Sequence, residues 1–320
     1  MNNSTSKKSL YIGAILTFNL LLAGVFVFPF LSLAKNEREI YVNAKATGVE
    51  DGSSENPYRT ISSALRKAKK NDKLFVANGE YKENIEIPKG VKIYGADRDE
   101  VIIKAKNDDD PVVEMNENTK INKVTIKNGK VGIKVEKNDD DVSIIDCVIE
   151  KNKRDGIKIE KGSVSKAHPV SVTENVIREN GWNGIYSETR RVVLMENNIY
   201  GNDRDGVELA EGSSAWIEDN RINDNDGVGF KFTLDNSNIW LKDNSIRDND
   251  KSGMEVDHFG NAGRVDISKS TIAENEKYGI ARVQKSLLTS SAWDGFTFDN
   301  KNTFFENKSK DVSDVIIVRQ

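Results

Sequence analysis

Hydrophobic and polar positions along most of this chain repeat in one short unit, Asn-x-Ile-x-x-Asn-x-x-x-Gly-(Ile/Val). The unit appears in full as NVIRENGWNGI from Asn175, NNIYGNDRDGV from Asn197 and NSIRDNDKSGM from Asn244. Relaxed copies begin at Cys147, Asn220, Ser270 and Asn302. The second Asn recurs at intervals of 22 to 32 residues, at Asn152, Asn180, Asn202, Asn225, Asn249, Asn275 and Asn307. Stacked copies of one unit with occasional loop insertions have this spacing, so we predict a solenoid.

The segments between the turns are predicted to be short strands. Runs such as GIKIE, AWIEDNRI and IWLKDNSI alternate apolar and polar residues and are rich in β-branched and aromatic side chains. No helical period recurs inside the unit, which disfavours leucine-rich and helical repeats. Coils of short strands that stack about 4.8 Å apart, each strand parallel to its copies, form a parallel β-helix.

Stacking places equivalent residues in columns. We expect each Asn to occupy a tight turn that needs the left-handed αL conformation, and stacked amides to bond along the axis. The Ile of the unit is expected to point into the core, at Ile149, Ile177, Ile199, Ile222, Ile246 and Ile272. The Gly is expected to let the chain bend into the next strand, at Gly156, Gly184, Gly206, Gly227, Gly253 and Gly279. Cys147 replaces one Asn, and we interpret it as a small, buried, unreactive thiol.

The ends of the stack need cover. Residues 35–72 are predicted to form a first strand and a cap helix, and residues 73–320 the repeats. TISSALRKAKK places apolar Ile61, Ala64, Leu65 and Ala68 on one helical face, with Thr60 as N-cap. We expect this helix to close the N-terminal end as a lid. At the other end, either the segment 284–312, expected to be irregular, or a partner covers the last strand.

Residues 1–34 differ from the rest of the chain. Lys7 and Lys8 precede an uncharged, mostly apolar run from Leu10 to Ala34. This pattern predicts either a signal peptide cleaved after Ala34 or an uncleaved membrane anchor. Both alternatives place the remainder outside the cytoplasm, as a secreted or a membrane-anchored protein.

Net charge and cysteine count argue against nucleic-acid binding and against cysteine-based cross-links or metal clusters. A net charge of −4 argues against a nucleic-acid partner, which would need a basic surface. With one cysteine the chain has no internal disulfide and no thiolate metal cluster.

Residues 41–96 resemble the N-terminal entry of secreted, pectate lyase-like, right-handed β-helix proteins. The matching positions are Asn56, Pro57, Tyr58, Thr60, Ile61, Gly79 and Tyr81. With the later repeats the resemblance spans residues 40–307 and implies an all-β, right-handed parallel β-helix. It is specific for fold and weak for function, because this superfamily holds lyases, hydrolases, epimerases and adhesins.

The resemblance suggests one candidate catalytic site. Uronate lyases and epimerases of this superfamily neutralise the sugar carboxylate, usually with carboxylate-held calcium, and use a base to remove the C5 proton. Their Asp-His elements are most similar here to EVDHFGNAGR, with Asp257 and His258 followed by Arg264. The match lacks the flanking Trp or Pro of those families. The alternative is that Asp257 and His258 begin an exposed inserted loop.

A second candidate is the strand after each repeat Gly. Its outward residues are predicted to be Lys158, Glu160, Tyr186, Glu188, Glu208, Lys231, Glu255 and Asp257. Stacked one coil apart they would form a mixed stripe that binds a ligand. Glu255 and Asp257 would be the calcium ligands, and Tyr186 with Trp182 a stacking surface for a sugar ring. The alternative is a solvated face kept charged against aggregation.

Two functions follow from these observations. The first is a non-catalytic envelope module that presents a flat face to polysaccharide or to another surface partner. The second is a calcium-assisted uronate lyase or C5-epimerase that works at Glu255, Asp257 and His258. The absence of a complete catalytic set favours the first.

Overall fold

The computed structural model describes residues 37–165, 168–258, 263–284, 295–313 and 317–318. The predicted signal or anchor segment, residues 1–34, lies outside these ranges. Among the described residues, no helix is long and apolar enough to cross a membrane.

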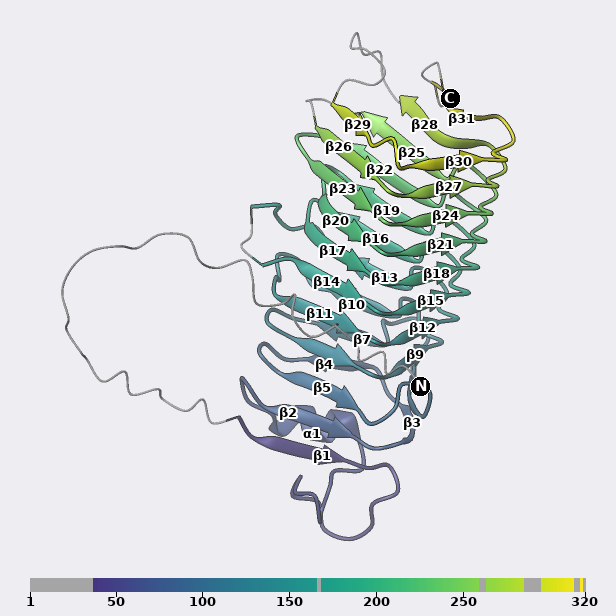
Figure 1. The fold of residues 1–320 in the computed structure, drawn as a ribbon. Helices are drawn as coiled ribbons and strands as arrows, with labels where there is room; N and C mark the ends of the chain where they lie inside the picture. Colours follow the sequence, from purple (N-terminus) through teal and green to yellow (C-terminus); the bar gives the residue numbers. More distant parts are fainter. Residues whose placement is uncertain (1–36, 166–167, 259–262, 285–294, 314–316, 319–320) are drawn as a thin grey trace, which may run out of the picture. The chain divides into compact units, whose positions relative to one another are not determined.

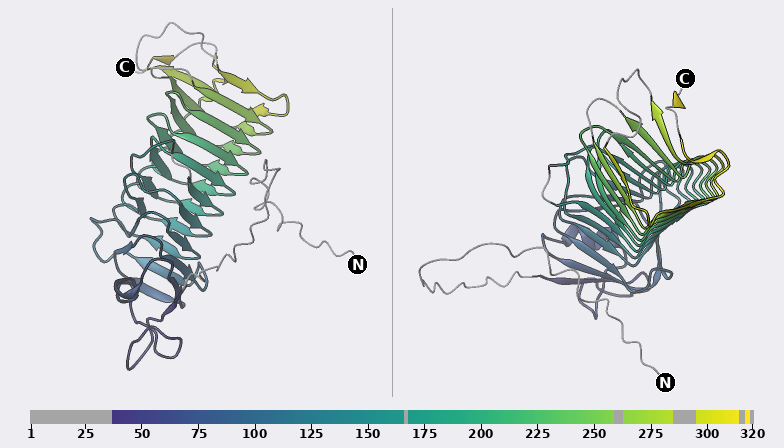
Figure 2. Two further views of the ribbon diagram at one scale, coloured as in Figure 1. Left: turned by 90° about the vertical axis from the view of Figure 1, so that its left-hand side faces the viewer. Right: turned by 45° about the horizontal axis from the view of Figure 1, so that its top comes forward.

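The described chain winds into stacked coils that contribute strands to three sheets (Figures 1 and 2). Sheet A contains β1 (Glu39–Val42), β2 (Lys73–Val76), β5 (Lys92–Gly95), β8 (Lys120–Asn122), β11 (Val142–Ile145), β14 (Val170–Thr173), β17 (Arg191–Met195), β20 (Ser214–Glu218), β23 (Asn238–Lys242), β26 (Arg264–Ser268) and β29 (Phe296–Phe298). Sheet B contains β3 (Gly79–Lys82), β6 (Val101–Lys104), β9 (Thr125–Lys127), β12 (Val148–Glu150), β15 (Val176–Arg178), β18 (Asn198–Tyr200), β21 (Arg221–Asn223), β24 (Ser245–Arg247), β27 (Thr271–Ala273) and β30 (Thr303–Phe305). Sheet C contains β4 (Ile85–Ile87), β7 (Val113–Met115), β10 (Ile133–Val135), β13 (Ile157–Ile159), β16 (Ile185–Glu188), β19 (Val207–Ala210), β22 (Phe230–Leu234), β25 (Met254–His258), β28 (Tyr278–Gln284), β31 (Lys310–Val312) and β32 (Ile317–Val318).

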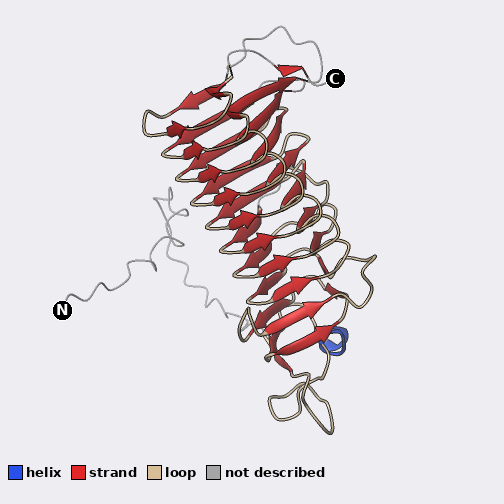
Figure 3. Ribbon diagram, turned by 90° about the vertical axis from the view of Figure 1, so that its right-hand side faces the viewer, coloured by secondary structure: helices blue, strands red, loops and turns tan. Residues whose placement is uncertain are grey.

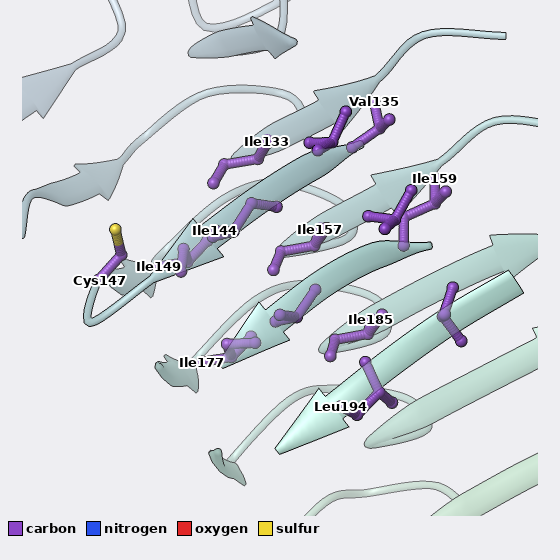
Figure 4. Close-up of a cluster of buried hydrophobic side chains, with 14 of the residues drawn as sticks. Ile133, Val135, Ile144, Cys147, Ile149, Ile157, Ile159, Ile177, Ile185 and Leu194 are labelled. Carbon is purple, nitrogen blue, oxygen red and sulfur yellow. The ribbon is translucent and has the colours of Figure 1, made fainter. Parts of the chain in front are cut away.

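Every strand pairs in parallel with its copy in the next coil, so the predicted parallel β-helix is confirmed. In sheet B, for example, Ile149 lies opposite Ile177, and Ile177 opposite Ile199. These side chains are buried, and Figure 4 shows Ile149 and Ile177 within the apolar core between the sheets. The regular alternation of apolar and polar residues therefore places one ladder of aliphatic side chains inside each sheet.

The two Asn columns form buried amide ladders, as predicted. In the second column the Nδ2 of Asn202 donates to the Oδ1 of Asn225 at 2.9 Å, and Asn225 donates to Asn249 at 3.0 Å. The same Oδ1 of Asn225 also accepts the backbone N–H of Asn202 at 3.2 Å. Each amide thus satisfies polar groups that the corner of the coil would otherwise leave buried and unpaired.

The expected backbone conformation of these Asn residues is wrong. The positive φ falls on the residue before each Asn, at Glu179 (φ 53°), Asp224 (φ 54°) and Asp248 (φ 54°). Gly201 occupies the same place before Asn202, with φ 62°. The corner therefore selects Asn for its buried amide, while the exposed residue before it makes the left-handed bend.

The glycine column also differs from the prediction at one coil, where Gly229 replaces Gly227. A Cβ on Gly229 would lie 2.6 Å from Cγ2 of Ile246 and 2.7 Å from Nδ2 of Asn249. The predicted bend is wrong for the whole column, because none of its glycines has a positive φ. These glycines instead allow close approach between coils, at Gly156, Gly184, Gly206, Gly229, Gly253 and Gly279.

One short helix, α1 (Ile61–Lys67), lies beside the first coils (Figure 3). Thr60 is its N-cap, as predicted, and accepts the N–H of Ser63 at 3.1 Å. The Glu83 carboxylate accepts the N–H groups of Ile61 and Ser62 at 2.9 and 2.8 Å. The helix packs against β1 and β4 with Ile61, Ala64 and Leu65 buried. Its function as a lid on the stack stays a prediction.

The segment expected to be irregular contributes to the stack. Within residues 284–312, β29, β30 and β31 extend sheets A, B and C by one further coil. Residues 285–294 lie outside the described ranges. The copy beginning at Asn302 was the signal for this additional coil.

Candidate functional site

The charged stripe predicted after each repeat Gly lies on sheet C. Lys158 is opposite Tyr186, Tyr186 opposite Glu208, Glu208 opposite Lys231, and Lys231 opposite Glu255. The predicted stacking of these side chains is therefore observed, with one member in each coil. Their role in ligand binding stays a prediction.

The charges of this stripe largely neutralise one another. The Nζ of Lys231 lies 2.5 Å from Oε1 of Glu208 and 3.3 Å from Oδ2 of Asp205. The Nζ of Lys158 lies 2.8 Å from Oε1 of Glu160. The pairs of Lys231 join neighbouring coils, whereas Lys158 and Glu160 lie two positions apart in one coil. Both kinds of pair leave little net charge for a ligand.

Trp182 and Tyr186, the predicted stacking surface for a sugar ring, both make contacts with other side chains of the protein. Guanidinium groups of Arg154 and Arg204, one from each neighbouring coil, lie 4.5 and 4.3 Å from the Trp182 ring centroid. The Tyr186 hydroxyl donates to Oε1 of Glu188 at 2.7 Å. Burial, followed by this hydrogen bond, raises the pKa of Tyr186 well above its usual value.

Glu255 and Asp257 lie in strand β25 rather than in an exposed loop. Their exposed fractions are 6% and 3%, and the hydroxyl of Ser252 donates to Oε1 of Glu255 at 3.2 Å. The alternative interpretation, in which Asp257 begins an exposed loop, is therefore wrong for Asp257. The reason is that sheet pairing continues past Val256, with Asp257 opposite Thr233 and His258 opposite Leu234.

Arg264, the third predicted catalytic residue, lies on another sheet. It begins β26 of sheet A, and its guanidinium pairs with Asp266 at 2.8 and 3.1 Å. Among the described residues, no group of three or more His, Cys, Asp or Glu side chains is placed to hold a metal ion. The described carboxylates thus form no complete calcium site, and the catalytic residues and their calcium stay predictions.

A third polar column, missed by the sequence analysis, lies directly before the repeat glycines. The carboxylate of Asp155 accepts the N–H of Asn183 at 3.3 Å, and the Asn183 side chain accepts the N–H of Asp205 at 3.1 Å. Asp155 is buried, which raises its pKa to about 6. The recurrence of Asp or Asn before Gly was the signal available in the sequence.

The outer face of sheet A carries an aromatic ladder at its N-terminal end. The rings of Tyr41, Phe75 and Tyr94 stack one coil apart, with centroids 5.6 Å apart in both pairs. They line a hollow of about 240 Å³ that Asn43 and Pro57 also border. An aromatic wall with a few polar groups is typical of sites for small molecules and sugar rings.

A column of lysines runs beside this ladder on the same strands. Lys73 is opposite Lys92, and Lys92 opposite Lys120. The Nζ of Lys120 lies 5.3 Å from the centroid of Tyr94. Burial and then the charge of Lys92 lower the pKa of Lys120. The sequence analysis missed this column because the three coils fall before the recognisable Asn repeats.

Two tryptophans project from the same face further along the stack. Trp216 in β20 and Trp240 in β23 are opposite one another, with ring centroids 6.3 Å apart. Their exposed fractions are 45% and 38%, and the indole N–H of Trp216 donates to Oε2 of Glu218 at 2.9 Å. The two exposed indoles on adjacent coils form an apolar patch, and tryptophan is enriched in the interaction surfaces of proteins. Their equivalent places in AWIEDNRI and IWLKDNSI were the sequence signal, which we used only to predict strands.

The lysine column and the tryptophans belong to one line of side chains. Ser143 follows Lys120, and Ser171, Val193 and Trp216 follow in successive coils. These intervening residues are small and uncharged. The outer face of sheet A therefore connects both clusters through a track without charge.

Comparison with known families identifies the fold. A family model described as a right-handed β-helix region matches residues 89–186 and 164–313. No curated protein matches the chain.

Solved structures support the same assignment. The crystal structure of pectate lyase Pel9A is 16% identical, covering 83% of this chain and 79% of its own, with a TM-score of 0.64. The complex of XylC with xylose is 12% identical, covering 77% and 69%, with a TM-score of 0.57. The A-module of Azotobacter vinelandii mannuronan C-5 epimerase AlgE6 is 14% identical, covering 81% and 94%, with a TM-score of 0.52.

At these identities the structural likeness shows the fold alone. The family match, however, spans more than half of the chain and agrees with the three parallel sheets described above. This chain therefore belongs to the right-handed parallel β-helix family, whose pectate lyase-like fold the N-terminal resemblance implied.

Proposed function

We propose that this protein binds polysaccharide without catalysis and that the outer face of sheet A is its binding face. The observation that carries the proposal is the exposure of Trp216 and Trp240 on adjacent coils. Indole rings pack against the apolar faces of sugars and have polar N–H groups for hydroxyls. The sequence analysis predicted the binding face on sheet C, and we now propose sheet A instead. The reason is that charged side chains of the sheet C stripe form ion pairs within the protein.

The structural relatives add support. Their names mention pectate, xylose and mannuronan, and all three have TM-scores above 0.5. A flat parallel sheet whose side chains repeat every coil suits a polymer that repeats along its own axis.

Binding is tested by affinity electrophoresis of the protein through gels that contain pectate, alginate or xylan. We expect retardation by at least one polymer, and a loss of affinity of about tenfold or more in the Trp216→Ala/Trp240→Ala variant. Arg221→Ala, an exposed change on sheet B, is the control and leaves retardation unchanged. Equal retardation of wild type and the tryptophan variant would refute the proposed face.

The proposal includes location outside the cytoplasm, either secreted or anchored through residues 1–34. Mass spectrometry of the N-terminus of the protein from its native cells distinguishes the alternatives. A chain beginning at Lys35 indicates cleavage and secretion, and an intact N-terminus in the membrane fraction indicates an anchor.

The second candidate function is a calcium-assisted uronate lyase or C5-epimerase at Asp257. The observation in its favour is the burial of two carboxylates, Glu255 and Asp257, at successive outward positions of β25. The assay incubates the protein with pectate and alginate plus Ca²⁺, following unsaturated product by absorbance and C5 inversion by NMR. Activity that disappears in Asp257→Asn would replace the binding proposal as the main function.

A further inference from the structure

Lys92 and Lys120 form a pair of like charges on the outer face of sheet A. They are direct neighbours across the β5–β8 pairing, about 4.8 Å apart along the stack. Among the described residues, no carboxylate lies within ion-pairing distance of either ammonium, whereas Lys73 in the same column pairs with Glu37 at 2.5 Å. The two ammonium groups repel each other, as the effect of Lys92 on the pKa of Lys120 indicates, and an anion between them would relieve this repulsion.

The aromatic ladder of sheet A adjoins these two lysines, and Nζ of Lys120 lies 5.3 Å from the ring centroid of Tyr94. Tyr94 follows Lys92 by two positions along β5, so both side chains lie on the same side of the sheet. Tyr94 and Phe75 form part of the wall of the 240 Å³ hollow, and Asn43 and Ser54 contribute polar groups to its lining. Neither lysine lines the hollow, so the ring of Tyr94 is the group that the lysine column and the hollow have in common.

We propose that this end of sheet A binds a carboxylated sugar residue, so that the polysaccharide recognised by the protein is acidic. The ammonium groups of Lys92 and Lys120 bind the carboxylate, and the ring of the sugar contacts the edges of Tyr94 and Phe75. This inference rests on the proposed function and specifies its ligand as a uronate-containing polymer. Charge complementarity favours this occupant over a neutral glycan.

The acidic-sugar subsite and the tryptophans are placed for one ligand. Lys120 and Trp216 are separated by four coil steps, which is roughly 19 Å at about 4.8 Å per step. The side chains between them are Ser143, Ser171 and Val193, which carry no charge. A polymer lying along this track contacts both ends, and the second contact then forms at a high effective concentration.

A matched pair of lysines on another face provides the control. Lys104 and Lys127 are opposite one another on sheet B, and among the described residues neither has an ion-pair partner. No aromatic ladder adjoins them in that column, where Glu150 is the next member. The changes Lys92→Gln/Lys120→Gln and Lys104→Gln/Lys127→Gln therefore alter the net charge equally on different faces.

The experiment measures binding of the exported chain to polygalacturonate and to the same polymer after chemical reduction of its carboxylates. We expect wild type to prefer the acidic polymer by about tenfold or more, with affinity that falls as salt rises. Lys92→Gln/Lys120→Gln should remove this preference while keeping tryptophan-dependent binding to the reduced polymer. Lys104→Gln/Lys127→Gln should keep the preference.

The outcomes separate this inference from the proposed function. The acidic-sugar subsite would be overturned if both double-lysine variants lost the preference for the acidic polymer equally, or if neither lost it. The proposed function would still stand in that case, provided that Trp216→Ala/Trp240→Ala weakens binding. Absence of binding to both polymers would overturn the proposed function. Light scattering that shows a dimer of wild type and a monomer of Tyr94→Ala would assign the face to a second copy of the chain, which also overturns the inference.

Discussion

At the scale of single residues, buried amides connect one coil to the next. Asn225 is fully buried, and its Nδ2 donates to Asn249 while its Oδ1 accepts from both the backbone and the side chain of Asn202. Removal of such a group leaves several buried partners unsatisfied at about 1–3 kcal/mol each. The free-energy cost of leaving these buried partners unsatisfied explains why Asn recurs in this column, although the backbone there has no left-handed conformation that would favour Asn.

We therefore expect Asn225→Ala to lower the free energy of unfolding by about 3 kcal/mol. Urea denaturation followed by circular dichroism measures this change. The neighbouring exposed substitution Asp226→Ala should alter stability by less than about 0.5 kcal/mol. A similar small effect of both changes would show that the ladder contributes little.

Asp155 predicts how stability depends on pH. Burial raises its pKa to about 6 in the folded protein, against about 3.9 in an unfolded chain. Between these values the folded state binds the proton and the unfolded state does not, so stability from this group is fully present below about pH 4. It declines as the pH rises toward 6 and is absent above that value.

Asp155→Asn should therefore be similar to wild type in stability at pH 4 and more stable by about 3 kcal/mol at pH 7. The amide keeps an oxygen for the N–H of Asn183, which itself occupies the same column. Urea unfolding at several pH values between 4 and 7 tests this. Parallel stability curves for the two proteins would contradict the raised pKa.

At the scale of the element, close packing between coils decides which glycines are essential. A Cβ on Gly229 would lie 2.7 Å from the carbonyl oxygen of Gly253, which is backbone and cannot rotate away. Gly201 has positive φ, but a Cβ there would find no atom closer than 4.0 Å. The two glycines thus differ in physical role.

We expect Gly229→Ala to destabilise the fold by about 2–4 kcal/mol, because neighbouring coils must separate. Gly201→Ala should cost only about 1 kcal/mol, the strain of a left-handed conformation. Thermal unfolding of both variants makes the comparison. A larger effect at Gly201 would indicate that backbone conformation, rather than coil spacing, dominates at these corners.

At the scale of the whole stack, each described strand pairs only with its copies in the neighbouring coils. Stability in such proteins is approximately a sum over repeats and their interfaces. A complete coil is therefore expected to be removable if the columns keep their register, whereas a partial coil is not.

Deletion of residues 202–224 joins Gly201 to Asn225, so Asn225 takes the place of Asn202. The variant should keep a β-rich circular dichroism spectrum and cooperative unfolding at a lower midpoint, with Trp240 in the place of Trp216. Deletion of residues 202–213, a partial coil, should abolish cooperative unfolding. Equal tolerance of both deletions would contradict the columns.

Prediction from the sequence succeeded where the repeat is strict. The Asn ladders, the inward Ile column and the buried Cys147, whose pKa burial raises to about 12, all follow from residue type and spacing. Prediction failed where two nearby glycines could both occupy the position of closest approach between coils. Gly227 and Gly229 are only two positions apart, and only the contacts between coils distinguish them.

The site was harder to predict than the fold. Trp216 and Trp240 fit a strand pattern equally well as inward or outward residues until the register placed Ala215 and Ile217 inside. Asp257 and Arg264 are close in sequence but fall on different sheets, in β25 of sheet C and β26 of sheet A. Sequence distance is a poor guide to spatial distance in a coil whose corners turn the chain.

The sequence by itself determined the architecture of this protein, because a repeated pattern of buried Ile and Asn can satisfy its core and its backbone only by stacking in register. Tertiary structure alone decided which charged and aromatic side chains remain without internal ion pairs on the outer faces. Charges that look free along the chain are neutralised on sheet C by partners in adjacent coils, while lysines and aromatic rings from distant segments meet on sheet A. The physical reason is that stacking brings together residues about one coil apart in sequence, and short-range pairing between them settles which groups remain exposed.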